Sequence, residues 1–184
     1  MKQRYLSRAY LIAGLATLAI LVWLTVVSPP APDRLSLGVL FGAVIVFADV
    51  FGAPLAGAVV SLLPMATVAA YLVIGPAATG WAAFAGALIH GELRYRWAEQ
   101  LRLPRVTSRA ELVTIGAANA TAHTVGVLAG GAAFQALGGN TPLSTFELSG
   151  ALPLMLFALT YLAANHLVFL PTMAARGREV PQHS

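Results

Sequence analysis

One stretch of the chain predicts where the centre of the fold lies: Ser108–Gln135, which reads SRAELVTIGAANATAHTVGVLAGGAAFQ. The spacing Ser108-x-x-Glu111 is that of a capping box, which marks the start of a helix. Small and polar residues then recur at helical spacing along one face. Small residues let neighbouring helices approach closely, and an amide or imidazole inside a membrane needs a partner there. We therefore expect this helix in the middle of a bundle, with its inner face formed by Gly116, Asn119, His123, Gly126 and Gly130.

The composition of the chain is that of an integral membrane protein. Of its 184 residues, 58% are hydrophobic and only 10% are charged, whereas soluble domains carry about 25% charged residues. The net charge of +4 comes from basic residues that flank apolar segments, so we expect the lipid bilayer as a partner and no nucleic acid. The chain contains no cysteine, which excludes disulfides, thiolate nucleophiles and cysteine-ligated metals.

The apolar runs predict an all-α bundle of six membrane segments. A retained first helix is expected rather than a cleaved signal peptide, because the first run is about long enough to cross a bilayer and no A-x-A-like site follows it. Residues 1–178 then form one integral membrane domain, and residues 179–184 form a polar tail. The six segments are expected at Ala9–Val27, Leu35–Val50, Ala58–Ile74, Ala77–Gly91, Ser108–Gln135 and Leu148–Leu170.

The third and fourth segments leave two alternatives open. Both are short for a hydrocarbon layer of about 30 Å, Pro64 lies inside the third, and Gly75-Pro76 allows only a tight turn between them. They form either an ordinary spanning hairpin or a broken, re-entrant hairpin buried among the other helices. In both cases the chain returns to the side that it left.

Basic residues predict the orientation. Ten of the lysines and arginines fall on one side of the six-segment arrangement and only Arg34 on the other, which places both termini in the cytoplasm of a cell with an inner (plasma) membrane. Leu93, Trp97 and Leu101 recur every four residues in the charged connector Glu92–Pro104, so we expect a short amphipathic helix lying at the membrane interface. The interfacial residues of this region are Arg94, Arg96, Trp97, Arg102, Arg105 and Arg109.

Polar side chains inside the membrane segments are the candidates for a binding site. Counted from the cytoplasmic ends, four of them fall in the same half of the bilayer, on segments two, four, five and six, and His123 lies deeper. They are expected to line one cavity and to hydrogen-bond a small ligand. The alternative is structural: amides that bridge two helices for about 1 kcal/mol each, and an Asp49 that reaches the interface. The proposed ligand-binding residues are Asp49, Asn119, His123, Asn165 and His166, with His90 near the same side.

The sequence favours a non-enzymatic protein without a cofactor. His90, His123 and His166 fall on different segments and lack an H-x-x-x-H or E-x-x-H pair, so no metal or haem site is expected. No paired aspartates, Ser/His pair or zinc motif stands at a spacing typical of intramembrane proteases, and neither a P-loop nor a GxGxxG element is present.

Several short motifs resemble a bacterial family. They are Val59-Val60-Ser61-Leu62, Ile74-Gly75-Pro76-Ala77, Gly91-Glu92 ahead of arginines, Asn119 after the basic loop, and Tyr161-x-x-x-Asn165. Over Ser36 to Arg178 the chain resembles the multi-helix membrane sensor regions at the N-termini of HD-GYP, GGDEF and histidine-kinase signalling proteins. The resemblance implies ligand or membrane sensing coupled to a cytoplasmic output domain. Since no output domain follows before Ser184, we expect a truncated sensor or a stand-alone relative that acts on a cytoplasmic or membrane partner protein.

Two other classes remain open beside this sensor-like, ligand-binding module. Six helices with both ends cytoplasmic also resemble the substrate-binding S components of energy-coupling-factor transporters, in which Ala9-x-x-x-Ala13 would contact a partner. The third class is a structural or assembly subunit that binds no ligand.

Overall fold

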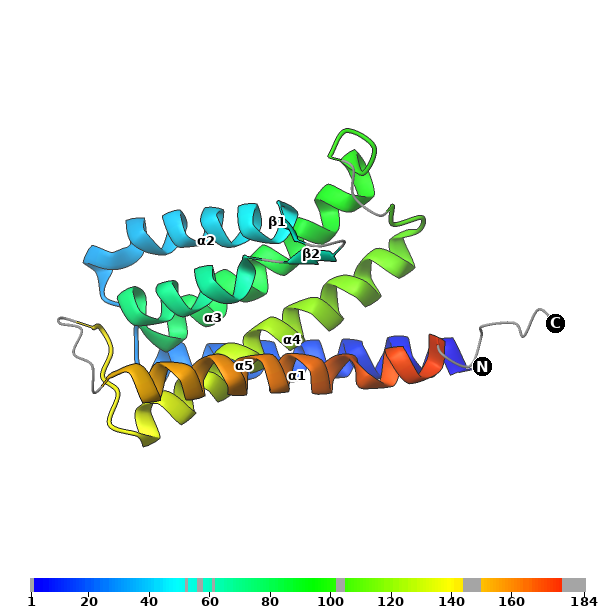
Figure 1. Ribbon diagram of the computed structural model, residues 1–184. Coiled ribbons are helices and arrows are strands. Elements are labelled where there is room, and N and C mark those ends of the chain that lie inside the picture. Colours follow the sequence, from blue (N-terminus) through cyan, green and yellow to red (C-terminus); the bar gives the residue numbers. More distant parts are fainter. Residues whose placement is uncertain are drawn as a thin grey trace.

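The computed structural model of the protein describes residues 2–51, 53–55, 58–60, 62–101, 105–143 and 150–176. Within these ranges the chain is a bundle of five α-helices with one small β-hairpin (Figure 1), so the predicted helical bundle is confirmed. The helices are α1 (Lys2–Val27), α2 (Leu35–Val50), α3 (Leu63–Trp97), α4 (Arg109–Ala136) and α5 (Ala151–Arg176), and a 3-10 turn, η1 (Pro32–Arg34), precedes α2. Strands β1 (Ala53–Leu55) and β2 (Ala58–Val60) pair antiparallel.

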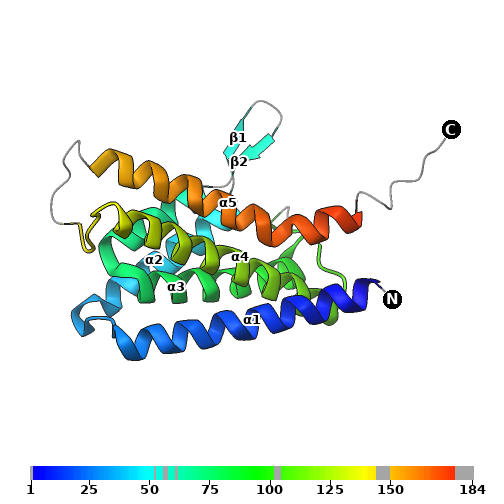
Figure 2. The same ribbon diagram turned by 90° about the horizontal axis from the view of Figure 1, so that it is seen from below.

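Helix α4 lies at the centre of the bundle and packs against α1, α3 and α5 (Figure 2). Its glycines admit large side chains from the neighbouring helices. A Cβ atom placed on Gly126 would lie 3.0 Å from the Tyr161 ring, one on Gly130 would lie 2.8 Å from the carbonyl oxygen of Phe157, and one on Gly131 would overlap the ring of Tyr71. Because these positions lack side chains, α3 and α5 can approach α4 closely, as its glycine-rich face predicts.

Helix α3 reverses its direction in the middle. Gly75 has a φ of +81°, outside the helical region, and Pro76 follows it. Tyr71 and Ala83 belong to the same core cluster, although twelve residues of a straight helix would separate them by about 18 Å. The first half of α3 (residues 63–74) therefore runs antiparallel to the second half (residues 76–97), as Figure 1 shows.

Two external contacts hold this reversal. Pro76 has no N–H to donate to the carbonyl of Leu72, and the break at Gly75 interrupts the hydrogen bonding of the last turn before it. The backbone N–H of Leu143 donates to the Leu72 carbonyl at 2.8 Å, and the guanidinium of Arg34 donates to the Val73 carbonyl at 3.1 Å. The α1–α2 connection and the loop after α4 are thus both tied to the turn inside α3.

The lengths of the helices do not support the expectation of six crossing segments. Four helices, α1, α3, α4 and α5, are long and apolar enough to cross a membrane, whereas α2 has only 16 residues. The first half of α3 extends about 18 Å at about 1.5 Å per residue, well short of the hydrocarbon layer. Pro64 does not kink a helix interior, because α3 begins at Leu63 and proline is well tolerated in a first turn.

The segment between α2 and α3 and the charged connector also differ from the expectation. Residues 58–60, expected at the start of a helix, form strand β2, because a short apolar run is compatible with either structure. Helix α3 continues through Trp97, so no separate amphipathic helix begins at Glu92. Likewise Pro171 lies inside α5 instead of ending it.

We predict that Gly75→Ala destabilises the protein by about 1–2 kcal/mol, because an L-residue with a Cβ atom is strained at positive φ. Thermal unfolding followed by circular dichroism in detergent measures the change. Gly42→Ala is the matched control: Gly42 is inside α2, and a Cβ atom there would meet nothing within 4 Å. It should leave stability unchanged or slightly raised. Equal losses in the two variants would contradict the prediction.

Candidate functional site

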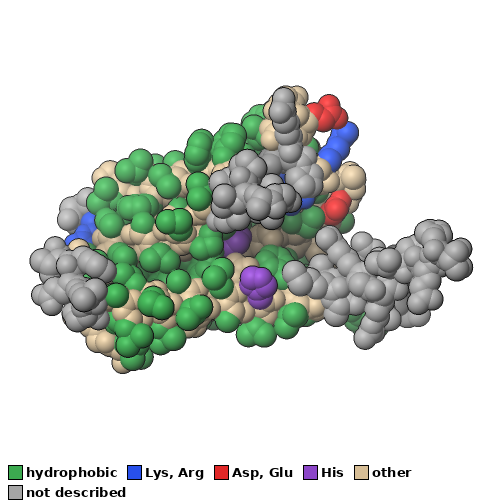
Figure 3. Space-filling view, viewed as in Figure 1, with side chains coloured by type: hydrophobic (Ala, Val, Ile, Leu, Met, Phe, Trp, Pro, Cys, Tyr) green, Lys and Arg blue, Asp and Glu red, His purple; other side chains and the backbone are tan. Residues whose placement is uncertain are grey.

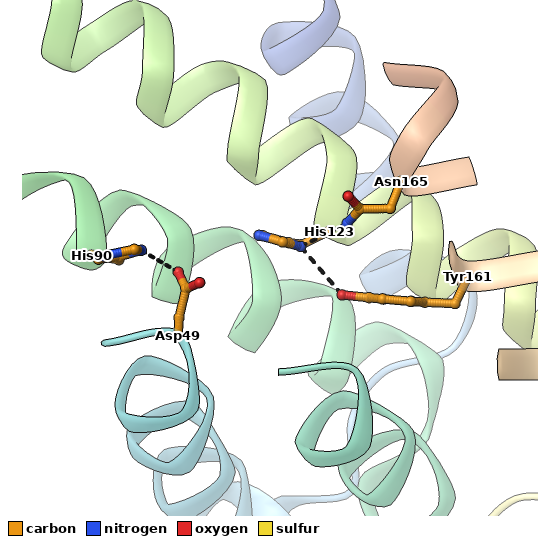
Figure 4. A network of polar contacts seen from close by, with 5 residues as sticks. All are labelled: Asp49, His90, His123, Tyr161 and Asn165. Atoms are coloured by element: carbon orange, nitrogen blue, oxygen red, sulfur yellow. Dashed lines mark hydrogen bonds and ion pairs between the residues drawn. The ribbon is translucent and has the colours of Figure 1, made fainter. Parts of the chain in front are cut away.

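Polar side chains from four helices gather on one side of α4 (Figure 4). We call them the polar cluster. It contains two groups that face one another: a pair from α2 and α3, and a trio from α4 and α5. Its members are Asp49 of α2, His90 of α3, His123 of α4, and Tyr161 and Asn165 of α5.

The first group is a carboxylate–imidazole pair. Nδ1 of His90 donates to Oδ2 of Asp49, and both side chains are nearly enclosed. His90 is 8% exposed, and its second nitrogen, Nε2, is buried and makes no hydrogen bond to the described residues. The pair therefore retains an unused polar atom in the interior.

The packing of α2 on the second half of α3 brings this pair together. Gly86 has no side chain, so Ile45 packs closely against α3 at that position. Asp49 and His90 each lie four residues further along, and one helical turn returns a side chain to the same face. The contact between Ile45 and Gly86 thus sets the register in which the carboxylate meets the imidazole.

The second group is organised around His123. Its Nδ1 lies 2.9 Å from the amide nitrogen of Asn165 and 3.2 Å from the hydroxyl of Tyr161. An amide nitrogen can only donate, so Nδ1 accepts and the proton of the neutral ring is on Nε2. Figure 4 shows that this other nitrogen points toward Asp49, and Asp49 and His90 are both close enough to interact electrostatically with His123.

Close packing of α5 on α4 fixes the partners of His123. The Tyr161 ring lies against Gly126, and the tyrosine is 1% exposed. Asn165 is one turn further along α5, which places its amide next to the imidazole. The hydroxyl of Thr67, near the start of α3, is a further neighbour of the Tyr161 hydroxyl.

The structure brings together three of the five residues proposed for the ligand site: Asp49, His123 and Asn165. Asn119 lies one turn before His123 on the same face of α4, and its side chain makes no hydrogen bond within the described part of the chain. His166 is not part of the polar cluster. It is exposed, and its Nδ1 donates to the carbonyl of Leu162 at 2.8 Å.

Tyr161 is the member that the sequence did not assign to the site. A tyrosine in an apolar helix resembles an ordinary core or interfacial aromatic residue. Its position one turn before Asn165 was the available signal, because side chains four residues apart share a helix face.

The interfacial residues of the connector lie at one end of the bundle, which we call the basic end. Arg94 and Arg96 are in the last turn of α3, and Arg109 is the first residue of α4. Exposed ion pairs join Arg96 to Glu92 at 2.9 Å and Arg105 to Glu99 at 3.3 Å. Trp97 is also exposed, and Arg102 lies outside the described residues.

Comparisons with known proteins return no match: no family model fits the chain, and neither a curated protein nor a solved structure is significantly similar to it. Functional inference therefore depends on the geometry of the polar cluster.

The polar cluster can hydrogen-bond a small polar molecule. It presents the Nε2–H of His123 as a donor and the second carboxylate oxygen of Asp49 as an acceptor, and Figure 4 shows each on the side of its group that faces the other group. Within the described ranges, no three His, Asp or Glu side chains are placed to hold a metal ion.

We predict that Asp49→Leu destabilises the protein by about 1–3 kcal/mol, because it leaves the buried imidazole of His90 without its partner. The double variant Asp49→Leu/His90→Leu should regain most of that loss, since an apolar pair leaves no unsatisfied group. Thermal unfolding in detergent tests both variants. The single variant His90→Leu completes the comparison. If the loss of stability in the double variant equals the sum of the losses in Asp49→Leu and His90→Leu, the two side chains are not coupled as described.

Proposed function

We propose that this protein is a non-enzymatic, sensor-like module of the inner membrane that binds a small polar ligand between two groups of helices. The observation that carries the proposal is the convergence of polar side chains from α2, α3, α4 and α5, with the buried Nε2 of His90 left without a hydrogen bond to the described residues. Leaving buried polar atoms unpaired costs free energy. A ligand that forms hydrogen bonds with these atoms would remove that cost, and its affinity would be higher for that reason.

Binding at this place can change the arrangement of the helices. A ligand that contacts Asp49 and His123 would bridge the α2–α3 pair and the α4–α5 pair. A ligand shifts a conformational equilibrium by its difference in affinity for the two states. Helix α5 carries two members of the polar cluster and continues to Arg176, so it is the natural element to transmit the change to a cytoplasmic partner. The resemblance of its short motifs to those of bacterial signalling sensor regions favours the same role.

For the topology we propose four crossing helices and one re-entrant hairpin. Helix α2 and the first half of α3 are too short to cross a layer of about 30 Å, and both begin or end near Arg34, which bonds to Val73. Helices α1, α4 and α5 and the second half of α3 cross the bilayer. Arg94, Arg96 and Arg105 at the basic end support an orientation with both termini in the cytoplasm.

Single-cysteine labelling tests this topology, because the chain has no cysteine of its own. We predict that a membrane-impermeant maleimide labels Ser28→Cys and Asn140→Cys in intact cells, and labels Gln100→Cys only after the cells are lysed. All three positions are exposed. Labelling of Gln100→Cys in intact cells would reverse the proposed orientation.

Ligand binding is tested by native mass spectrometry of the protein purified in mild detergent. We predict that the unmodified protein retains a small-molecule adduct and that Asn119→Leu/Asn165→Leu loses it while remaining folded, because the variant removes the amide beside His123 and the unpaired amide one turn before it. His166→Leu is the control on the same helix, since His166 lies outside the polar cluster, and it should retain the adduct.

An adduct of equal abundance in the double variant would contradict a site at the polar cluster. If the unmodified protein carries no adduct and instead purifies with a stable membrane partner, the chain is a structural or transporter subunit and the sensor proposal is wrong.

A further inference from the structure

We infer that a proton is a ligand of this site: protonation of His123 rearranges the contact between α4 and α5. The inference rests on the proposed sensor function and names one signal that the site would detect. It is carried by the hydrogen bonds around His123 and by the direction of its ring.

In the structure, Nδ1 of His123 accepts a hydrogen bond from the amide nitrogen of Asn165 at 2.9 Å. When the ring is protonated, both of its nitrogens become donors. Nδ1–H then faces the N–H of the amide, and two donors cannot share a hydrogen bond. Either the amide rotates by about 180° to present its oxygen, or α5 moves so that the amide withdraws.

Tyr161 gives the protonated ring an alternative partner. Its hydroxyl oxygen lies 3.2 Å from the same Nδ1 and can accept a hydrogen bond as well as donate one. The partner of Nδ1 therefore changes from Asn165 to Tyr161, one turn away on the same helix. This exchange favours a displacement of α5 along α4.

The charge of the protonated ring acts on the other side of the site. Nε2 of His123 points toward Asp49 (Figure 4), and one oxygen of that carboxylate is already held by His90. An imidazolium would be attracted to the carboxylate and repelled by a charged His90. Protonation thus strengthens the connection from α4 to α2 while it moves the hydrogen bond between α4 and α5 from Asn165 to Tyr161.

The titratable groups near His123 come from three elements. They are Asp49 of α2, His90 of α3 and Tyr161 of α5. Helix α1, which also packs on α4, adds no charged group to those that act on His123 within the described residues. Imidazole is the side chain that exchanges its proton between about pH 5 and pH 8, and His123 is partly exposed at the surface of the described chain.

The test measures the distance between α4 and α5 by pulsed electron paramagnetic resonance. Spin labels are attached at Val113→Cys and Leu170→Cys, two exposed positions, and the protein is placed in phosphatidylcholine nanodiscs at pH 8 and pH 5. The expected result is a shift of the distance distribution between the two pH values.

Two variants should each remove the pH-dependent shift. His123→Asn cannot gain a proton and can still accept a hydrogen bond, so it should show the pH 8 distribution at both pH values. Asn165→Asp places an acceptor-only carboxylate beside the ring, so the protonated Nδ1–H keeps its partner at position 165 and the distribution should be the same at both pH values. His166→Gln, the neighbouring exposed histidine, should retain the full shift.

The inference is overturned if the unmodified protein shows no shift, or if His123→Asn or Asn165→Asp shifts as the unmodified protein does. Native mass spectrometry at pH 8 separates this failure from failure of the proposed function. An adduct without a pH-dependent shift supports the proposed ligand sensor and contradicts the proton inference. A shift without an adduct supports the proton as the ligand and contradicts binding of a small molecule.

Discussion

Close approach of helices to the glycines of α4 is the constraint on which the rest of the structure depends. In a bilayer the hydrophobic effect does not draw one apolar helix to another, so van der Waals packing and interhelical hydrogen bonds must do so. Gly126, Gly130 and Gly131 let aromatic side chains of α3 and α5 lie against the backbone of α4. The polar cluster follows from this approach, because a side chain at Gly126 would displace Tyr161 and separate His123 from its partners.

The members of the polar cluster are carried by helices that differ in how firmly they are held. Half of the most apolar 18-residue stretch of α4 is buried inside the protein, compared with 17% of the corresponding stretch of α5. Helix α5 is thus attached to the bundle mainly along one narrow face, which includes Tyr161 and Asn165. A change in hydrogen bonding at these two residues acts directly on this face of α5, whereas the same change on α4 would be resisted by three neighbouring helices.

Local chemistry made part of the fold predictable from sequence. Ser108 caps α4 through a bond from the Glu111 N–H at 3.1 Å, as the capping box indicates. Gly75-Pro76 marked the turn within α3. The hairpin of β1 and β2 was not predictable, because its few apolar residues are compatible with a helix. The hairpin separates α2 from α3, so the start of α3 was not predictable either.

The candidate site was predictable where a polar residue inside the membrane had to find a partner. This reasoning selected Asp49, His123 and Asn165, which the structure places together. It could not separate Asn165 from His166, although adjacent residues differ by about 100° around a helix and only one of them can face α4. Nor could it select Tyr161. A tyrosine in an apolar helix is expected to pack through its ring, as Tyr161 does on Gly126, and the sequence does not reveal that its hydroxyl lies beside His123.

The bonds from Arg34 and Leu143 to the carbonyls at the turn of α3 make the two ends of the bundle mechanically unequal. At that end the α1–α2 connection, the α3 turn and the loop leading toward α5 are joined to one another. Helix α5 is held to α1 nearer the basic end, where the hydroxyl of Tyr10 donates to the carbonyl of Val168 at 3.1 Å. A movement of α5 that begins beside His123 is therefore limited by this contact on one side and by the close packing of Phe157 on Gly130 on the other.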